Sequence, residues 1–276
     1  MLKKLIIFTD LDATLLDHKH YDFTAAQHAL NTIVRHQIPL ILNTSKTVAE
    51  THEIRKKLNI HHPFIIENGS GVCYPAGYFS TTQHDNTNND WKVLSFGLSY
   101  QDIQNILTKI NQIQHYKYQN FNQLNPEEIA KITGLTIDQA CLAKQRNGTE
   151  PFLWEDTPEN LTTFIQLLEN DHLHVTQGGR FYHISSPCDK GKAMLQLLRD
   201  FQRAYPHNDW LTVALGDSPN DYPMLENADI AVVIKPSTEK PPLSLTNHPR
   251  VIYTTKPGPE GWQQAMEQLF NEFALD

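Results

Sequence analysis

Two carboxylates stand two positions apart where an apolar run near the start of the chain ends. The run "LIIF" at residues 5–8 is followed by Thr9 and then by Asp10 and Asp12. Side chains two positions apart on an extended chain project to the same side, so both carboxylates can act on one group. One can act as a nucleophile while the other transfers a proton. The pair therefore favours nucleophilic and acid–base chemistry, although two turn residues after a strand would also fit.

Further polar residues follow three later apolar runs. They are Thr44, Ser45 and Lys46 after "IPLIL", Glu67, Asn68 and Gly69 after "PFII", and Asp217, Asn220 and Asp221 after "LTVAL". The carboxyl ends of parallel strands meet at one edge of an open sheet, so we expect these residues to lie near Asp10 and Asp12. Gathered carboxylates repel each other and need a counter-charge, and their hard oxygens suit Mg²⁺. Thr44 and a nearby lysine can hold an anionic group beside the ion.

The elements that position these residues are predicted by the apolar runs themselves. The runs are continuous rather than alternating, and they are "LIIF", "IPLIL", "PFII", "LTVAL", "IAVVI" before Lys235 and "RVIY" before Thr254. Strands that helices bury on both faces require this pattern. Amphipathic helical segments are expected at residues 24–36, 47–58 and 189–201. Strands alternating with helices predict an α/β fold with a doubly wound, Rossmann-like parallel sheet.

The alternation of apolar runs and helical segments changes between residues 86 and 186. The polar stretch "STTQHDNTNND" precedes segments that are typical of helices, at residues 101–113, 126–132, 136–144 and 158–170. We expect residues 1–85 and 187–276 to form a core, and residues 86–186 to form a second unit inserted into it. The alternative is a long decorated loop of one domain, but structureless loops of this length are uncommon in compact domains.

Composition and charge exclude several classes of function. A chain of 276 residues can bury a sizeable core in one or two domains. The formal charge of -8 and a pI near 5.9 argue against general binding of nucleic acid, which depends on clustered Lys and Arg. The three cysteines are far apart and form no Cys-x-x-Cys pair, so they favour neither a disulfide framework nor a zinc site.

The same observations predict where the protein works. No apolar run approaches the length of a membrane-spanning helix. The apolar stretch in "MLKKLIIF" is too short for the core of a secretion signal. We therefore expect a cytoplasmic protein whose partner is a small molecule, with neither membrane nor nucleic acid as a partner. The sequence leaves the oligomeric state open.

Four short motifs, in order, resemble those of the haloacid dehalogenase superfamily of phosphatases. They are Asp10-Leu11-Asp12-Ala13-Thr14 for Asp-x-Asp-x-Thr, Thr44 at the end of a strand, Lys190 in "DKGKAM" ahead of a helix, and "GDSPND" at residues 216–221 for Gly-Asp-x-x-x-Asp. Any one of them alone would be a weak signal, whereas four in order are specific. Ala13 departs from the pattern, because this branch usually has glycine there, but the change removes no reacting group.

A closer resemblance is to the mannosyl-3-phosphoglycerate phosphatase family, and it spans most of the chain. It rests on "NTSKT" at residues 43–47, "PFIIENGSGV" at 63–72, "RNGTEP" at 146–151 and "GGRFYHI" at 178–184. In that family the inserted unit is an α/β cap of the C2 type over the active site. The resemblance implies hydrolysis of 2-O-mannosyl-3-phosphoglycerate to mannosylglycerate and phosphate, with Mg²⁺ as cofactor.

The resemblance also implies a role for each motif residue. Asp10 would be the nucleophile that forms an aspartyl phosphate, and Asp12 would protonate the leaving oxygen and later take a proton from water. Thr44 and Lys190 would grip the phosphoryl oxygens. The metal-binding residues would be Asp10, Asp12 through its backbone carbonyl, Asp217 and Asp221.

A phosphoglycerate carries a carboxylate that the residues binding the phosphate do not contact. Arginine matches a carboxylate in a bidentate way, which makes Arg146 and Arg180 candidates for this group. The full set of candidate substrate contacts is Ser45, Lys46, Arg146, Glu150, Gly179 and Arg180.

Three alternatives stay open at this point. Two are enzymes, namely another sugar-phosphate phosphatase, such as one for glucosyl-3-phosphoglycerate, and a phosphotransferase similar to phosphomannomutase. The third is a sensor that binds a phosphorylated sugar without turnover. The intact set of Asp10, Asp12, Lys190 and Asp217 argues against the sensor, because a pure binder needs no nucleophile beside a proton donor.

Overall fold

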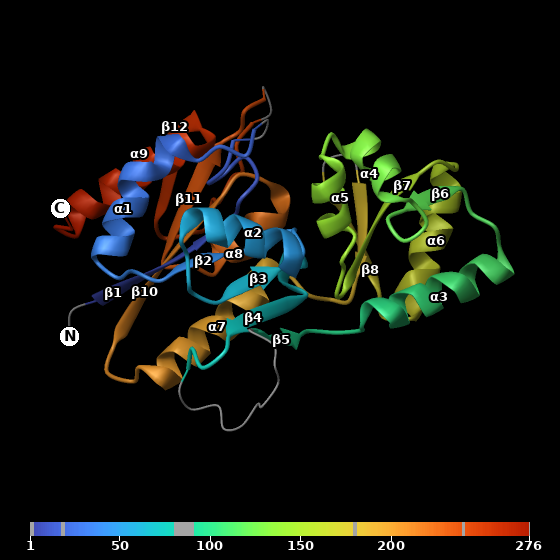
Figure 1. Cartoon of the computed structure of the whole chain (residues 1–276), viewed down its shortest axis with the longest axis horizontal. Coiled ribbons are helices and arrows are strands. Elements are labelled where there is room, and N and C mark those ends of the chain that lie inside the picture. The colour runs from blue at the N-terminus through green and yellow to red at the C-terminus, as the bar shows by residue number, and fades with distance from the viewer. Residues whose placement is uncertain (1–2, 18–19, 80–90, 179–180, 239–240, 276) are drawn as a thin grey trace.

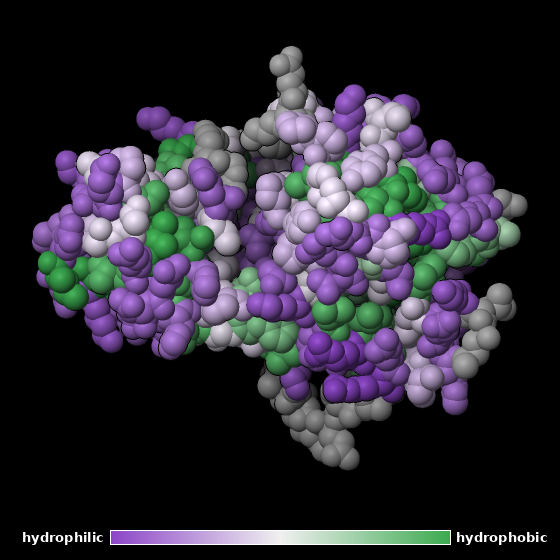
Figure 2. All heavy atoms as spheres, turned by 180° about the vertical axis from the view of Figure 1, so that it is seen from behind, coloured by the Kyte–Doolittle hydropathy of each residue, from purple (hydrophilic) through white to green (hydrophobic). Residues whose placement is uncertain are grey.

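The protein consists of two lobes joined by two chain segments (Figure 1). The computed structural model describes residues 3–17, 20–79, 91–178, 181–238 and 241–275. One lobe holds the first and last parts of the chain, and the other holds most of the middle part. Seen from behind, the surface is recessed where the lobes meet, and hydrophilic residues dominate there (Figure 2).

A five-stranded parallel sheet forms the centre of the first lobe. Its strands, in spatial order, are β12 (Val251–Pro257), β11 (Ile230–Lys235), β10 (Asp209–Gly216), β1 (Lys3–Thr9) and β2 (Leu40–Leu42). The order runs from β1 to β2 on one side and from β1 to β10 on the other. Ligands of such sheets bind at the carboxyl ends of the strands where the order reverses. The doubly wound sheet predicted from the sequence is confirmed.

Helices cover both faces of this sheet, which explains the continuous apolar runs. Leu5 and Ile7 of β1 pack in one core cluster, and the alternating Ile6 and Phe8 pack in another. The first cluster includes residues of α1 (Gln27–Arg35), α2 (Val48–Leu58) and α9 (Gly258–Glu272). The second includes residues of α7 (Lys190–Ala204) and α8 (Tyr222–Glu226). A short 3-10 turn, η1 (Thr24–Ala26), precedes α1.

One predicted strand has a different place from the one expected. The run "PFII" forms β3 (Phe64–Ile66), which belongs to an antiparallel sheet with β4 (Gly71–Pro75) and β5 (Trp91–Ser95). It touches the parallel sheet through a single bridge between Asn43 and Ile65. The reason is the left-handed backbone of the 3-10 turn η2 (Glu67–Gly69), which reverses the chain into β4 after only three residues.

The second lobe is built on a four-stranded antiparallel sheet. Its order is β6 (Tyr118–Asn120), β7 (Thr149–Trp154), β9 (Phe181–Ser185) and β8 (His174–Gly178). Its helices are α3 (Tyr100–Ile113), α4 (Pro126–Thr133), α5 (Ile137–Ala143) and α6 (Pro158–Asn170), close to the predicted segments. Each begins at a side-chain cap, and the caps are Ser99, Asn125, Thr136 and Thr157. The predicted α/β character of the insert is confirmed.

The division of the chain at residues 86 and 186 stays a prediction. Strand β5 lies within that insert by number, yet it pairs with β4, and its Trp91 and Val93 pack against the core of the first lobe. In the described part of the chain, no helix has both the length and the apolar character to cross a membrane.

Candidate active site

The carboxyl ends of β1 and β10 bring two of the predicted acidic motifs together. The strands pair in parallel up to Thr9 and Leu215, so Asp10 and Asp217 follow them at the same edge. Ligand oxygens of Asp10, Asp217 and Asp221 lie within 4.8 Å of one another. The edge of the sheet expected from the sequence therefore carries a cluster of three carboxylates.

Lys190 supplies the positive charge inside this cluster. Its Nζ atom lies 2.6 Å from Asp10 Oδ1 and 2.6 Å from Asp221 Oδ1, and its side chain is fully buried. Burial lowers the pKa of Lys190, but attraction to Asp10 and Asp221 outweighs this effect and raises it above its ordinary value. Lys190 is therefore a permanent cation shared by two carboxylates.

The loop after β10 is shaped by Asp221, the last residue of the 3-10 turn η3 (Pro219–Asp221). Asp221 Oδ2 accepts hydrogen bonds of 3.0 Å from the backbone N–H groups of Asp217 and Ser218. Its side chain also lies 2.5 Å from where a Cβ atom of residue 216 would stand, so this position requires glycine. Asp217 Oδ1 accepts from the Thr14 hydroxyl at 3.0 Å. Residues of both acidic motifs thus hold each other in place.

The charges of the cluster are not balanced by Lys190 alone. Burial raises the pKa of Asp10 well above its ordinary range, although Lys190 opposes the rise. Burial, with repulsion from Asp221, raises the pKa of Asp217 to about 7. A hard cation with an affinity for carboxylate oxygens would relieve this excess of negative charge. The donor set of Asp10, Asp217 and Asp221 therefore fits a divalent metal ion.

Asp12 faces a second buried lysine. Lys46 Nζ lies 3.0 Å from Asp12 Oδ1 and 4.6 Å from the centroid of the Tyr21 ring. Burial lowers the pKa of Lys46, but attraction to Asp12, Glu50 and Tyr21 outweighs it and raises the pKa. Ala13, next to Asp12, has a φ of 61°, the left-handed region that favours glycine. Ala13 therefore holds a backbone conformation that favours glycine, at the cost of backbone strain.

Thr44 and Ser45 form a tight loop between β2 and α2. The Thr44 N–H donates to Ile65 O at 3.1 Å, and the Asn68 N–H donates to Thr44 O at 2.9 Å. The Lys46 N–H donates to the Thr44 hydroxyl at 3.2 Å. Helix α2 then begins at Thr47 with a reciprocal cap between Thr47 and Glu50. The N-terminus of a helix favours anions, so this loop of residues 44–46, called the phosphate loop below, suits a phosphate group.

The residues predicted in the insert have varied surroundings. Arg146 Nη1 donates to Ser45 O of the phosphate loop at 3.1 Å, so the structure brings this arginine to the site. Glu150 is buried and accepts from the Asn122 N–H at 3.2 Å and from the Gln104 side chain. Burial raises the pKa of Glu150, and hydrogen bonds from Tyr100 and Gln104 oppose the rise. Gly179 and Arg180 lie outside the described residues.

Two contacts at this edge were missed by sequence reasoning. The Glu67 carboxylate accepts hydrogen bonds from residues 147–149 of the insert, and Asn68 Oδ1 accepts from Asn220 Nδ2 at 2.9 Å. Glu67 and Asn68 follow β3 and were expected near the site, but a strand-end position alone does not reveal a partner in a distant loop.

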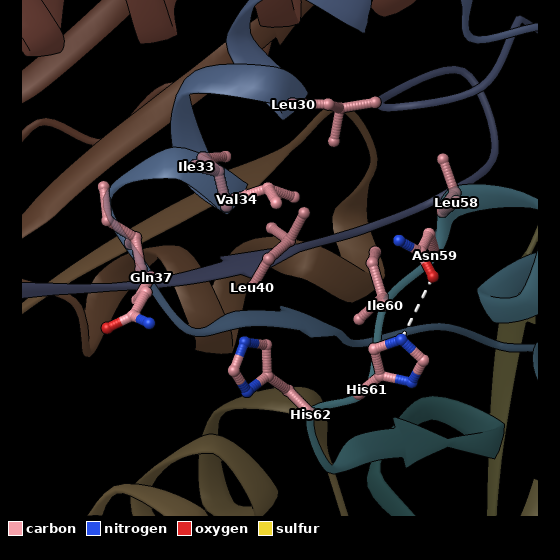
Figure 3. Close-up of a pocket in the computed structure, with 11 residues that line it drawn as sticks. Leu30, Ile33, Val34, Gln37, Leu40, Leu58, Asn59, Ile60, His61 and His62 are labelled. Atoms are coloured by element: carbon pink, nitrogen blue, oxygen red, sulfur yellow. Dashed lines mark hydrogen bonds between the residues drawn. The ribbon is translucent and has the colours of Figure 1, made fainter.

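A hollow elsewhere in the first lobe has no such chemistry. It has a volume of about 340 Å³ and is lined by Leu30, Ile33, Val34, Gln37, Ile38, Leu40, Leu58, Asn59, Ile60, His61 and His62. Most of these side chains are apolar, and no carboxylate is among them (Figure 3). Leu40 is the first residue of β2, so the hollow lies near the amino end of this strand, whereas Asp10 follows the carboxyl end of β1. The acidic cluster is the better candidate for catalysis.

Comparison with known proteins decides the family. Residues 7–241 match the model of the haloacid dehalogenase-like hydrolases. The chain belongs to this family. Two relatives are each 38% identical, one from Persephonella marina over 269 residues and one from Methanococcoides burtonii over 272. They cover 97% and 98% of this chain and 98% of their own, and both are named glucosyl-3-phosphoglycerate/mannosyl-3-phosphoglycerate phosphatase.

Solved structures of low sequence identity share the fold of this haloacid dehalogenase-like chain. A haloacid dehalogenase-like hydrolase from Bacteroides thetaiotaomicron has a TM-score of 0.65 at 16% identity, covering 97% of this chain and 100% of its own. The sucrose-phosphatase of Synechocystis, solved with sucrose and phosphate, has a TM-score of 0.59 at 16% identity, covering 99% and 98%. The family resemblance and the α/β fold with its parallel core are confirmed.

Proposed function

We propose that this phosphoric monoester hydrolase removes the phosphate of glycosyl-3-phosphoglycerates and accepts both the mannosyl and the glucosyl compound. The observation that carries the chemistry is the buried contact of Lys190 with Asp10 and Asp221 beside Asp217. The choice of substrate rests on two relatives that match nearly the whole chain and whose names include both sugars.

Asp10 is the nucleophile in this proposal. Its carboxylate attacks the phosphorus, the bond from phosphorus to the glycerate oxygen breaks, and an aspartyl phosphate forms. Lys190 holds Asp10 Oδ1 at 2.6 Å, and we assign the attack to the other oxygen, Oδ2. Water then attacks the phosphorus of the intermediate and releases inorganic phosphate and free Asp10.

Asp12 transfers the protons. It gives a proton to the glycerate oxygen as the first bond breaks, and it takes a proton from the attacking water in the second step. The ion pair with Lys46 orients the Asp12 carboxylate. A single residue can serve both steps because the leaving oxygen and the water occupy the same side of the phosphoryl group.

The phosphoryl oxygens are bound by Thr44 and Lys190, with the N-terminus of α2 favouring their negative charge. We propose Mg²⁺ as the metal, held by Asp10, Asp217, the Asp12 backbone carbonyl and the supporting Asp221. When bound, the ion supplies positive charge that neutralises the phosphoryl oxygens.

The rest of the substrate lies between the lobes in this proposal, with residues 86–186 as the cap. The glycerate carboxylate is bound by Arg146 and Arg180, with Ser45, Lys46 and Gly179 close to it. Glu150 was predicted as a substrate contact, but its buried carboxylate already accepts from Asn122 and Gln104, so we propose that it supports the substrate contacts from behind. Support comes from the Arg146 contact with Ser45 O, which places one arginine beside the phosphate loop.

Phosphate release from a panel of substrates tests the proposal. The panel holds mannosyl-3-phosphoglycerate, glucosyl-3-phosphoglycerate, 3-phosphoglycerate and hexose phosphates, each with Mg²⁺, for wild type and Asp10→Asn. We expect rapid release from the two glycosyl compounds only, and none from the variant. Preference for another compound would discard the substrate, transfer of phosphate between sugars would indicate a phosphotransferase, and no turnover of any would indicate a binder.

A further inference from the structure

Glu67 joins the two lobes through three hydrogen bonds. Its Oε1 atom accepts from the Asn147 N–H at 2.7 Å, and its Oε2 atom accepts from the Gly148 N–H at 3.1 Å and the Thr149 hydroxyl at 2.7 Å. The side chain is fully buried. A buried carboxylate needs such donors to replace water, so residues 147–149 must stay in place for Glu67 to remain buried.

The backbone of residues 67–69 has an unusual conformation, which brings this segment against the loop after β10 and against Asp189. Glu67, Asn68 and Gly69 have φ values of 47°, 57° and 94°, all in the left-handed region. Asn68 contacts Asn220 of the loop after β10, and Gly69 lies so close to the backbone of Asp189 that a Cβ atom would stand 2.2 Å from its oxygen. Residues other than glycine persist in this region where their surroundings hold them.

The same segment also fixes the phosphate loop. The Glu67 N–H donates to Lys46 O at 3.0 Å, and the Asn68 N–H donates to Thr44 O at 2.9 Å. From the insert, Arg146 donates to Ser45 O. Glu67 therefore contacts the phosphate loop with its backbone and the insert with its side chain, and Arg146 joins the same two parts one residue before Asn147.

The position of Thr149 gives this contact a consequence for the substrate. Thr149 is the first residue of β7, and Glu150 follows it. We propose that Glu67 is a positioning residue, whose carboxylate holds the start of β7 against the phosphate loop and thereby places the substrate contacts of the insert over Asp10. The inference rests on the proposed function only for the choice of substrate.

Amide hydrogen exchange tests the contact without any substrate. Glutamine at position 67 offers one acceptor oxygen to three donors, so in Glu67→Gln we expect the amides of Asn147 and Gly148 to exchange about tenfold faster or more. Asp229→Asn is the matched control, because Asp229 accepts from the Thr212 N–H and hydroxyl at 2.7 Å each, outside the insert. Unchanged exchange in Glu67→Gln, or equal acceleration in the control, would overturn the proposal.

Kinetics with two substrates separate positioning from general loss of structure. p-Nitrophenyl phosphate uses the phosphate grip but offers the insert no sugar and no carboxylate. In Glu67→Gln we expect the KM for mannosyl-3-phosphoglycerate to rise about tenfold or more, with kcat/KM for p-nitrophenyl phosphate within about threefold of wild type. Equal losses on both substrates would overturn the positioning role.

Variants of Thr149 keep the test valid if Glu67→Gln does not fold. Thr149→Val removes one donor and is expected to show the same split to a smaller degree, whereas Thr149→Ser keeps the hydroxyl and restores wild-type values. A Thr149→Ser variant as impaired as Thr149→Val would contradict the role of this hydrogen bond. If wild type hydrolyses neither glycosyl compound, the proposed function fails, while the exchange measurement still decides the role of Glu67.

Discussion

The Nζ atom of Lys190 lies 2.6 Å from Asp10 Oδ1, although the two residues are 180 positions apart in the chain. Asp10 follows the first strand of the sheet, and Lys190 is the first residue of the helix after the insert. The chain thus passes through the whole second lobe before it returns with the cation that the acidic cluster needs.

Removal of this cation is expected to cost both stability and activity. Lys190→Met leaves Asp10 and Asp221 facing each other without a counter-charge. Breaking a buried ion pair from one side costs about 3–5 kcal/mol of unfolding free energy, and loss of a phosphoryl contact costs about 10²–10³-fold in kcat. Urea unfolding and steady-state kinetics measure the two effects.

Lys192→Met is the control for this prediction. Lys192 lies on the same helix, but its side chain is 68% exposed and pairs with Asp189 at the surface. Exposed ion pairs contribute little, so we expect this variant to match wild type. If Lys190→Met is as stable and as active as Lys192→Met, the contacts of Lys190 with Asp10 and Asp221 are needed neither for stability nor for activity.

Asp12→Asn is expected to act differently on two kinds of ester. A glycerate oxygen needs a proton as it leaves, so kcat/KM for glycosyl-3-phosphoglycerate falls by about 10²–10⁴-fold. p-Nitrophenolate leaves without a proton, so stopped-flow absorbance is expected to show a burst of one equivalent followed by slow turnover. Equal losses on both esters with no burst would contradict the role of Asp12. Lys46→Met shows how much of the effect comes from the ion pair alone.

The raised pKa of Asp217 links metal binding to pH. Its folded-state pKa is about 7, above the ordinary 3.8, so the metal-free folded protein binds a proton more tightly than the unfolded chain does. Its contribution to stability therefore falls as pH rises through the window from about 4 to 7. We expect Mg²⁺ to raise Tm more at pH 8 than at pH 6, because the ion replaces the lost proton.

Thermal unfolding with and without chelator measures this dependence. Asp217→Asn removes one of the two carboxyl groups of the cluster whose pKa is raised, so its Tm in chelator is expected to depend less on pH than that of wild type. A Mg²⁺ effect on Tm that does not change between pH 6 and pH 8 would argue against Asp217 as a ligand.

Two glycines with left-handed backbones differ in what surrounds them. A Cβ atom at Gly69 would stand 2.2 Å from Asp189 O, whereas one at Gly77 would meet nothing within 4 Å. Alanine at either position costs about 1–2 kcal/mol of backbone strain. Gly69→Ala must also displace the backbone next to Lys190, so we expect a larger loss of stability and a loss of activity that Gly77→Ala lacks. Calorimetry and phosphate release compare the two, and equal behaviour would contradict the close approach.

The sequence predicts those parts of the fold that leave a local pattern. "LIIF" is apolar on both faces because Ile6 and Phe8 meet α7 while Leu5 and Ile7 meet α1 and α9, and this pattern is visible in four letters. The run "PFII" is also apolar, but its strand pairs antiparallel with β4, because the deciding feature is the left-handed turn that follows it. Hydrophobic pattern indicates burial, and it does not indicate which strand is the neighbour.

In the candidate site, too, the sequence predicts some features and leaves others open. The strand-end rule predicts that Asp10, Asp217 and Asp221 meet, because it depends only on parallel strands ending at one edge. It does not predict that Lys46 pairs with Asp12, or that Glu67 accepts from residues 147–149, since both depend on side-chain directions across loops. Arg146 was expected at the substrate carboxylate. In the structure it donates to the backbone oxygen of Ser45, a partner that the presence of an arginine in the sequence does not reveal.

Detection of the phosphoryl group on Asp10 tests the central claim most directly. Wild type and Asp12→Asn are mixed with mannosyl-3-phosphoglycerate and Mg²⁺, quenched in acid and reduced with borohydride, which converts an aspartyl phosphate to homoserine. We expect peptide mass spectrometry to find homoserine at position 10 in wild type and in Asp12→Asn, and none in Asp10→Asn. Phosphate release at the full rate by Asp10→Asn, or homoserine at another aspartate, would contradict Asp10 as the nucleophile.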